Sequence, residues 1–434
     1  MKTKITSTRT EILAGTSSFL ATFYIVIVNP AILSEAGMPF SAVVTSTILV
    51  CCFGSIMMGI YAKNPFVIAP GMGLNAFFTY TAVKGMGLSY EEALGAVFWA
   101  GVLFLILSLL KTRDKIVRCI PNSLRYAIAA GIGLFICFIG FQNAHFIVND
   151  TATLVSLGTL KDPVSLTFLA GLGITAILIV RKITGAMIIG ILLTTIMAWP
   201  IGRWWGDASL INFGRPTLVN YKGLFSMPDF SLFLSADLLG SIQYAFLPVI
   251  FVFAFTDLFD SLSTFVGLAE ASGYKEEDGN PKNLKKSLLV DSVTTIFSGL
   301  VGSSSGTAYI ESAVGIREGG RTGLAAITAG LLFLPFLFFS PLLSIVPSIA
   351  TSIALVLVGS FMMKPLTKIS WNTVDEAIPA FLTMILMPLT YSISTGIIFG
   401  FLSWTLLKLG TGKKQEISPT LIIINLLSLI FLWL

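Results

Sequence analysis

Charge is the property that this 434-residue sequence has least of. Only 11% of its residues are Asp, Glu, Lys or Arg, whereas a soluble domain carries about 25%. Hydrophobic residues make up 55%, and the mean hydropathy is +0.89, a value at which a water-soluble fold would aggregate. The shortage of charge therefore excludes a soluble enzyme and a nucleic-acid-binding domain.

Histidine and cysteine are also scarce. The single histidine is His145, and the four cysteines are Cys51, Cys52, Cys119 and Cys137, all in or beside apolar stretches and without a CxxC pair. Zinc, haem and iron–sulfur sites need more ligands than this set offers, so we expect no metal and no cofactor. We interpret the cysteines as reduced packing residues.

A signal peptide with a small-residue cleavage site is missing too, so we expect the first span to act as its own insertion signal. What the chain has instead is a series of apolar runs of 17 or more residues, from Ile12 to the end. Each is long enough to cross a hydrocarbon core of about 30 Å, and none alternates as the strands of a membrane β-barrel do.

We therefore predict an all-α polytopic membrane protein with about fourteen transmembrane helices. The predicted spans are 12–33, 40–62, 66–83, 93–110, 121–141, 164–180, 184–201, 240–268, 285–302, 305–316, 322–344, 348–363, 374–392 and 394–410. A further apolar stretch at 418–434 is interpreted as either an additional crossing or an interfacial helix.

The placement of basic residues predicts the orientation of the spans. With the N-terminus in the cytoplasm, 22 of the 27 Lys and Arg residues fall on the cytoplasmic side, in agreement with the positive-inside rule. The formal net charge of +5 is thus a topology signal, and nucleic acid is not expected as a partner. We expect a multi-pass protein of the plasma (inner) membrane. The basic residues left outside are Lys84, Lys161, Arg203, Arg215 and Lys222.

A long loop at 202–239, rich in Gly, Pro and Trp, divides the chain into two halves. The predicted domains are a first repeat at 1–201, an extracellular linker at 202–239, a second repeat at 240–410 and a hydrophobic tail at 411–434. Each repeat has seven spans. Because seven is odd, the two repeats must be inverted relative to each other in the membrane.

Two short spans are broken at corresponding positions of the repeats. The first break is the APGMG sequence at 69–73, and the second is GSSSG at 302–306. Paired broken spans indicate a transporter's binding site, because unpaired backbone at membrane depth must be buried in protein or line a cavity. The alternative is that both breaks are glycine kinks that allow close helix packing.

Four carboxyl groups and one amide lie at membrane depth, where polar groups are costly. Asp257 and Asp260 are three residues apart and therefore share one helix face. Asp291 lies in the following span, Glu311 just after the second break, and Asn75 at the equivalent place after the first. We interpret these residues as one polar site.

Each of these residues also has a structural alternative. The two aspartates of one helix could form a hydrogen-bonded pair within the bundle. Asp291 could pair with Lys285 or Lys286, and Asn75 could cap the helix that follows the first break.

The composition of the site restricts its ligand. Arg and Lys are missing at this depth, so an anionic substrate is poorly supported, whereas carboxylates and an amide suit a cation or a neutral ligand rich in N–H donors. A buried carboxylate can also take up a proton, because burial favours its neutral form. A stacking face for a flat ring could come from Phe77, Phe78, Phe253 and Phe255.

At these segments the sequence resembles the azaguanine-type purine permeases, a branch of the nucleobase–cation symporters. The matching stretches are ATFYIVIVNPAILSEAGMP at 21–39, APGMGLNAFFTY at 69–80, FTDLFDSLSTFVGLAEASG at 255–273 and YIESAVGIREGGRTGLAA at 309–326. The resemblance extends over residues 10–410. It implies a fourteen-helix inverted repeat, with helices 1–4 and 8–11 in a core domain and helices 5–7 and 12–14 in a gate domain.

The resemblance also implies proton-coupled uptake of adenine, guanine or hypoxanthine by alternating access of the core against the gate. The family's purine-contacting positions fall on Asn75, Asp257 and Glu311. Its proton-coupling acid in the eighth helix falls on Asp260, and the acid of its ninth helix falls on Asp291. The implied partners are a purine nucleobase, a proton and the lipid bilayer, and the prediction leaves open a homodimer.

Three alternatives remain. The first is a carrier on the same fold for another substrate, such as uracil, xanthine or a small anion. The second is an intramembrane enzyme, against which one histidine and unpaired cysteines argue, so we expect no enzymatic activity. The third is a channel, which uptake that saturates and accumulates substrate against a gradient would exclude.

Overall fold

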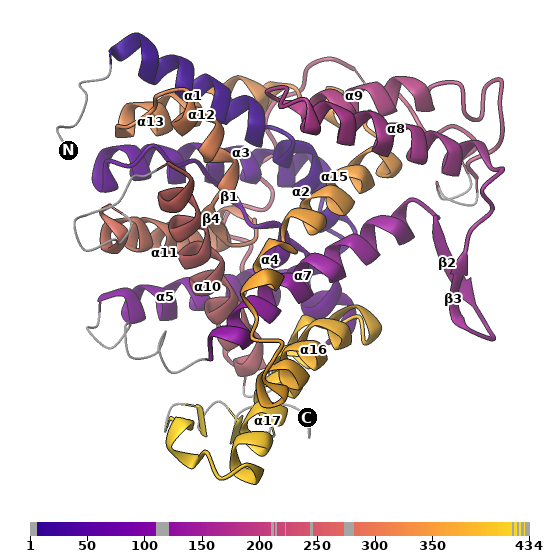
Figure 1. The fold of residues 1–434 in the computed structure, drawn as a ribbon. Coiled ribbons are helices and arrows are strands. Elements are labelled where there is room, and N and C mark those ends of the chain that lie inside the picture. The colour runs from indigo at the N-terminus through magenta and orange to yellow at the C-terminus, as the bar shows by residue number, and fades with distance from the viewer. Residues whose placement is uncertain are drawn as a thin grey trace.

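The computed structural model describes residues 7–109, 121–209, 212, 215–221, 223–243, 246–272, 282–418, 421–422, 425–426 and 429. These residues form helices and two short two-stranded sheets (Figure 1). Eight of the described helical stretches are long and apolar enough to cross a membrane by length and composition alone. The predicted all-α membrane fold is confirmed.

In the part of the first half that the structure describes, seven helical segments correspond to the seven predicted spans. The hairpin β2–β3 (Ile147–Asp150 and Leu154–Leu157) follows the fifth of them and projects from the bundle (Figure 1). In chain order the segments are α1–α2 (Thr8–Thr22 and Ile25–Ser34), α3–η1 (Phe40–Met57 and Met58–Ala62), β1–α4–η2 (Ile68–Pro70, Met72–Ala76 and Phe77–Gly85), α5 (Tyr90–Leu109), α7 (Asn122–Asn143), α8 (Pro163–Val180) and α9 (Ala186–Ala198).

The second half repeats this order of elements. Short helices precede, connect or follow its segments, namely η3 (Gly240–Ile242), α14 (Ser340–Leu343), η7 (Lys364–Lys368) and η8 (Lys414–Glu416). The segments are α10 (Leu247–Ser272), α11 (Leu284–Val301), β4–η5–α12 (Gly306–Ala308, Ile310–Ser312 and Ala313–Arg317), α13–η6 (Gly323–Phe333 and Leu334–Phe338), α15 (Ser348–Phe361), α16 (Val374–Leu389) and α17 (Ile393–Gly410).

The segments agree with the predicted spans in number and order. The eighth span, predicted from 240, begins at Leu247, because Gly240–Ile242 forms a separate turn. The first span was predicted as continuous but is interrupted at Phe23–Tyr24, between α1 and α2. Of the predicted tail at 418–434, only 418, 421–422, 425–426 and 429 belong to the described residues, so its relation to the membrane stays a prediction.

The helices gather in two groups. In one, α13 packs against α1 and α3, and α5 packs against α10 and α11. In the other, α7 packs against α15, α16 and α17, while α8 and α9 pack against each other and against α15. The first group lies on the left of Figure 1 and the second on the right and below. They are the core and gate domains of the expected fold.

The contacts within each group repeat in the order that an inverted repeat requires. The second helix packs on the eleventh (α3 on α13), as the ninth packs on the fourth (α11 on α5). In the gate, the sixth helix packs on the seventh (α8 on α9), as the thirteenth packs on the fourteenth (α16 on α17). One seven-helix arrangement has thus been built twice from the two halves.

Glycine allows the tightest of these contacts. A Cβ atom at Gly323 of α13 would overlap the backbone of Gly59 in η1, and a Cβ at Gly59 would overlap the carbonyl oxygen of Gly323. Small residues at helix crossings let backbones approach closely and gain van der Waals contacts. These contacts stabilise the packing, because lipid supplies no hydrophobic driving force between helices. Any side chain at either position would push the second and eleventh segments apart.

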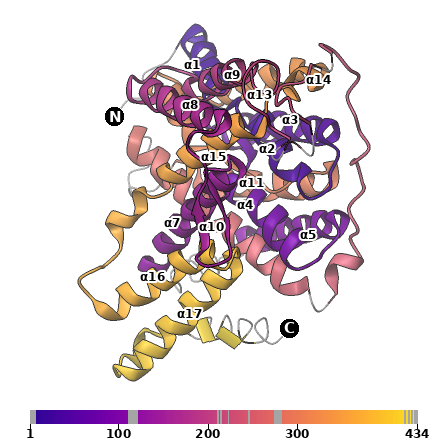
Figure 2. The ribbon, with the colours of Figure 1, turned by 90° about the vertical axis from the view of Figure 1, so that its right-hand side faces the viewer.

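The linker between the halves crosses one end of the core domain and runs along the right-hand edge of Figure 2. The N–H of Ser226 donates to Phe338 O at 3.0 Å, and that of Leu234 donates to Leu300 O at 2.7 Å. The Ser41 hydroxyl donates to the Asp229 carboxylate at 2.7 Å. Because it is bonded to several core segments, the linker acts as a strap across their ends.

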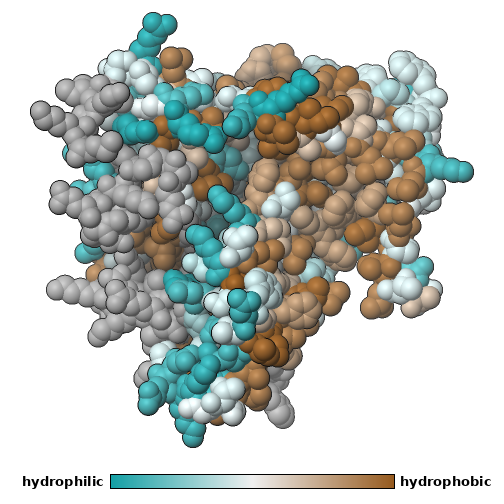
Figure 3. All heavy atoms as spheres, in the orientation of Figure 1, coloured by the Kyte–Doolittle hydropathy of each residue, from teal (hydrophilic) through white to brown (hydrophobic). Residues whose placement is uncertain are grey.

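The outer surface of the gate is apolar, and brown residues cover the right-hand side of Figure 3. On α8, the side chains of Leu166, Leu169, Ile177 and Val180 are exposed. A continuous apolar surface of this kind is the lipid-facing side of a membrane protein.

The hairpin β2–β3 beyond α7 carries a carboxylate outside the membrane segments. The N–H groups of Thr153 and Ala152 donate hydrogen bonds to the Asp150 carboxylate and lower its pKa.

Candidate functional site

The two broken spans meet at the centre of the core domain. Strands β1 and β4 pair antiparallel, with Ile68 opposite Ala308 and Pro70 opposite Gly306. The pairing continues where the N–H of Gly71 donates to Ser305 O at 3.0 Å. Each half thus satisfies backbone groups of the other at membrane depth, where water is not available. The glycine-rich breaks are therefore not simple kinks, and short helices lead away from the pair in both repeats.

Asn75 connects the first half-helix to the second break. It is fully buried inside α4, whose N-cap is Gly71, so it does not cap this helix. Its Oδ1 accepts a hydrogen bond from the hydroxyl of Ser304. Its Nδ2 is buried and has no hydrogen-bond partner among the described residues, so this amide has a donor left over for a ligand.

Asp257 and Asp260 face the paired breaks from α10. Asp257 has no solvent exposure, and its Oδ2 accepts a hydrogen bond from the Thr295 hydroxyl of α11 at 2.6 Å. Its Oδ1 is without a partner in the described part of the chain. Asp260, one turn further, is only half-buried, and its Oδ2 lies 3.7 Å from where a Cβ at Gly71 would be.

Asp291 lies one helical turn before Thr295 on α11 and is fully buried. Neither of its carboxylate oxygens accepts a hydrogen bond from a described residue, although the Ser261 hydroxyl lies close to it. Its charge lies close enough to those of Asp257 and Asp260 to interact with them. The described ion pairs do not include one with Lys285 or Lys286, which are exposed at the start of α11. Asp291 therefore belongs to the acidic cluster.

Glu311 lies in η5, directly after the second strand. Its Oε1 accepts a hydrogen bond from the hydroxyl of Tyr24 at 2.8 Å, and its charge interacts with that of Asp260. Next to it, Tyr309 donates its hydroxyl proton to the carbonyl oxygen of Pro70 at 2.5 Å. The four acids and Asn75 are thus all placed around the pair β1–β4.

Tyr24 was not predicted as a site residue. It lies in the interruption between α1 and α2, which an evenly apolar stretch does not reveal. The one available signal was a hydroxyl-bearing side chain inside the ATFYIVIVNP stretch that carries the family resemblance. Its contact with Glu311 joins parts of the chain that are far apart in sequence, and such a contact cannot be deduced from local patterns.

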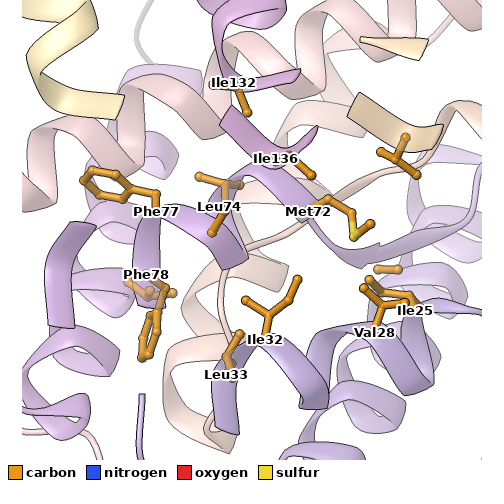
Figure 4. Close-up of a cluster of buried hydrophobic side chains, with 14 of the residues drawn as sticks. Ile25, Val28, Ile32, Leu33, Met72, Leu74, Phe77, Phe78, Ile132 and Ile136 are labelled. Atoms are coloured by element: carbon orange, nitrogen blue, oxygen red, sulfur yellow. The ribbon is translucent and has the colours of Figure 1, made fainter. Parts of the chain in front are cut away.

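The aromatic residues proposed for ring stacking divide into two sets. Phe77 and Phe78 are fully buried, and Phe77 packs edge-on against Phe253 with ring centroids 4.6 Å apart. They belong to the hydrophobic cluster of Figure 4, in which Leu74 of α4 lies between Ile132 of α7 and Ile32 of α2. These rings are packing residues.

Phe255 has a different position. Its ring stacks on Phe251 with centroids 5.7 Å apart and meets Phe401 of α17 edge-on at 5.8 Å. It therefore lies where the core helix α10 meets the gate helix α17. It is 5% exposed and belongs to the same hydrophobic cluster, so it too is a packing residue.

The remaining residues singled out in the sequence have no part in the site. Among the described residues, no group of three His, Cys, Asp or Glu side chains could hold a metal ion. Cys51, Cys52 and Cys137 are free thiols, and Cys119 lies outside the described residues. His145 lies beyond the end of α7, with a φ of 52°.

The sequence and the fold of this chain can be compared with those of known proteins. The profile of the permease family matches residues 9–399 of this chain. The chain belongs to this family. The permease is 42% identical to the adenine permease AdeP of Escherichia coli (strain K12), with 97% of this chain and 92% of that protein aligned. It is also 42% identical to the guanine/hypoxanthine permease PbuO of Bacillus subtilis (strain 168), with 100% and 99% aligned.

Solved structures share the permease fold. The transmembrane domain of the cyanobacterial bicarbonate transporter BicA superimposes with a TM-score of 0.64, covering 92% of this chain and 98% of that domain. The two sequences are 17% identical. SLC26A9 superimposes with a TM-score of 0.62 at 11% identity, covering 92% of this chain and 65% of that one. These likenesses show that the chain shares the overall fold of these two proteins.

Proposed function

We propose that this permease takes up purine nucleobases, namely adenine, guanine or hypoxanthine, across the plasma membrane, coupled to proton entry. Relatives over nearly the full chain are named adenine and guanine/hypoxanthine permeases. The orientation with a cytoplasmic N-terminus and an extracellular linker, argued from the basic residues, forms part of the proposal. The protein acts as a carrier and not as an enzyme.

The observation that carries the substrate proposal is a set of buried polar atoms from both repeats that lack partners. Asn75 offers an N–H donor from the first repeat, and Asp257 offers a carboxylate acceptor from the second. Buried polar groups are nearly always hydrogen-bonded, and leaving one unpaired costs about 1–3 kcal/mol. A purine presents both N–H donors and acceptor nitrogens or a carbonyl, so Asn75, Asp257 and Glu311 would bind it.

Asp260 and Asp291 are proposed to carry the coupled proton. Asp260 is the more exposed of the two aspartates of α10, so it can exchange a proton with water, and it interacts with the charge of Glu311. Asp291 is buried behind it without a hydrogen-bonded partner among the described residues. Protonation of either group removes one negative charge from the cluster of four carboxylates. Proton binding therefore changes the net charge of the site that would hold the purine.

Transport is proposed to proceed by alternating access, with the core moving against the gate. The site belongs to the core, because α4, α10, α11 and η5 contribute its groups. The gate meets it through Phe401 and through Ile132, which lies against Gly73 of the first half-helix. A displacement of the core would therefore carry the purine from one side of the membrane to the other.

The test is uptake of labelled adenine by the purified protein in liposomes with an inward-directed proton gradient. Accumulation should exceed the equilibrium level and should collapse when a protonophore dissipates the gradient. Unlabelled adenine, guanine and hypoxanthine should compete, whereas uracil, xanthine and bicarbonate should not. Uptake of none of the purines, or competition by bicarbonate alone, would contradict the proposal.

A further inference from the structure

Tyr24 is held in the protein interior at an irregular point of the first membrane segment. It is 1% exposed and forms the N-cap of α2, within the interruption between α1 and α2. The carbonyl of Tyr24 accepts N–H groups from Ile27 at 3.1 Å and Val28 at 3.0 Å, so its backbone is fixed by the turn that it begins. Its side chain points from this turn to Glu311.

We propose that Tyr24 is a positioning residue for purine recognition, which orients the Glu311 carboxylate toward the ligand. The inference rests on the function proposed above and assigns a second residue to the same contact. Tyr24 donates to Oε1 at 2.8 Å, so that Oε2 is left to accept a hydrogen bond from the purine. A glutamate has three rotatable side-chain bonds, and a group held in its binding geometry beforehand loses less freedom when the ligand arrives.

The surroundings of Tyr24 distinguish this role from simple packing. The ring belongs to the main hydrophobic cluster, so the substitution Tyr24→Phe keeps the packing and removes only the hydroxyl group. Tyr309 provides a comparison, because it also lies beside Glu311 but donates its hydroxyl to the backbone carbonyl of Pro70. Removal of the Tyr309 hydroxyl therefore weakens the strand pair β1–β4 and does not act directly on the Glu311 carboxylate.

The experiment is adenine binding to purified parent protein, Tyr24→Phe, Glu311→Gln and the double variant. We expect Tyr24→Phe to weaken binding about five- to tenfold, the size expected for one hydrogen bond. In the Glu311→Gln background the same substitution should change affinity less than about twofold, because the carboxylate that it orients is gone. Tyr309→Phe should have the same effect in both backgrounds.

Two controls keep the outcome decisive. Tyr126→Phe on the gate, where the ring contacts Lys368, should leave binding unchanged. Thermal unfolding of each variant separates loss of recognition from loss of the fold. Equal weakening by Tyr24→Phe with and without Glu311, or no weakening at all, would overturn the positioning role. A parent protein that binds no purine would instead contradict the proposed function.

Discussion

Pro70 and Gly306 lie opposite each other in the antiparallel pair β1–β4, although they belong to different halves of the chain. The Tyr309 hydroxyl reinforces this contact through the Pro70 carbonyl. Neither break can satisfy its backbone alone, so the site requires both repeats to be in place. Its polar residues come from segments that are distant in sequence, with Asn75 in the first repeat and Asp257, Asp260, Asp291 and Glu311 in the second.

The first prediction separates the two aspartates of α10. Asp260→Asn should keep purine binding and exchange down a gradient but lose accumulation driven by a pH difference, since only the proton site is neutralised. Asp257→Asn should weaken binding itself, by about ten- to a hundredfold if a charge-assisted hydrogen bond to the purine is lost. Binding and pH-driven uptake are measured on both variants in the same vesicles.

Equal loss of binding in the two variants would refute this division of roles. In that case the two carboxylates would act as one coupled pair, because acids this close can share a proton. Asp150→Asn on the projecting hairpin serves as the control, since it neutralises a carboxylate far from the site and should change neither property.

The second prediction concerns the contact between core and gate on the predicted outer side. Asn143, the last residue of α7, donates to Glu35 at 3.0 Å and to the Tyr80 hydroxyl at 3.4 Å. Lys84 pairs with the same Glu35 carboxylate at 2.7 Å. Asn143→Leu removes the donor from the gate, so the outer ends of the domains should separate more often.

The measurement is the rate at which a membrane-impermeant maleimide, added from outside, modifies a cysteine introduced at Phe135. This position is buried on α7 and packs edge-on against Tyr80. The native cysteines are replaced beforehand. Asn143→Leu should raise the rate several-fold, whereas Asn149→Leu on the exposed hairpin should not. An unchanged rate in Asn143→Leu would show that this contact does not hold the outer side closed.

The third prediction tests the closest helix crossing in the core. Gly323→Ala places a methyl group into the backbone of Gly59 and should destabilise the protein by about 1–3 kcal/mol, the usual cost of overpacking. Gly173→Ala on α8 is the matched control, because nothing lies within 4 Å of its Cβ position. Thermal unfolding in detergent compares the two variants, and equal melting temperatures would contradict the packing argument.

The fourth prediction concerns a buried charge in the gate. Lys408 of α17 is 2% exposed and pairs with Asp375 at 2.8 Å, Glu376 at 2.9 Å and Glu416 at 2.8 Å. Lys408→Met leaves these carboxylates facing one another and should cost about 3–5 kcal/mol of stability. Lys413→Met should cost less, since Lys413 is 47% exposed and pairs only with Asp375 among the described residues. A larger effect at Lys413 would reverse this ranking.

Sequence patterns were sufficient for the features that depend on local composition. Apolar length predicted the segments, and glycine-rich interruptions marked the two breaks, because both properties are carried by neighbouring residues. The acids Asp257, Asp260, Asp291 and Glu311 could be selected as candidates because charge at membrane depth is conspicuous, and their roles stay a prediction.

Features that depend on distant contacts were missed. The interruption at Phe23–Tyr24 contains no glycine or proline that would predict it from the sequence. The Tyr24 hydroxyl donates a hydrogen bond to Glu311, which lies in the other half of the chain. Phe77 and Phe78 were candidates for ring stacking, but the neighbours brought by other segments make them part of the core. Such assignments need the tertiary structure.

The meeting of Gly73 with Ile132 has a mechanical consequence. A Cβ at Gly73 would come within 2.7 Å of the Ile132 Cγ2, so the first half-helix lies directly on α7 with no side chain of its own between them. The neighbouring contacts in Figure 4 are also between hydrocarbon groups. Among the described residues, this contact between the half-helix and the gate therefore contains no hydrogen bond and no ion pair. The alternating access proposed above would move the half-helix that carries Asn75 across α7 without breaking a polar interaction at this point.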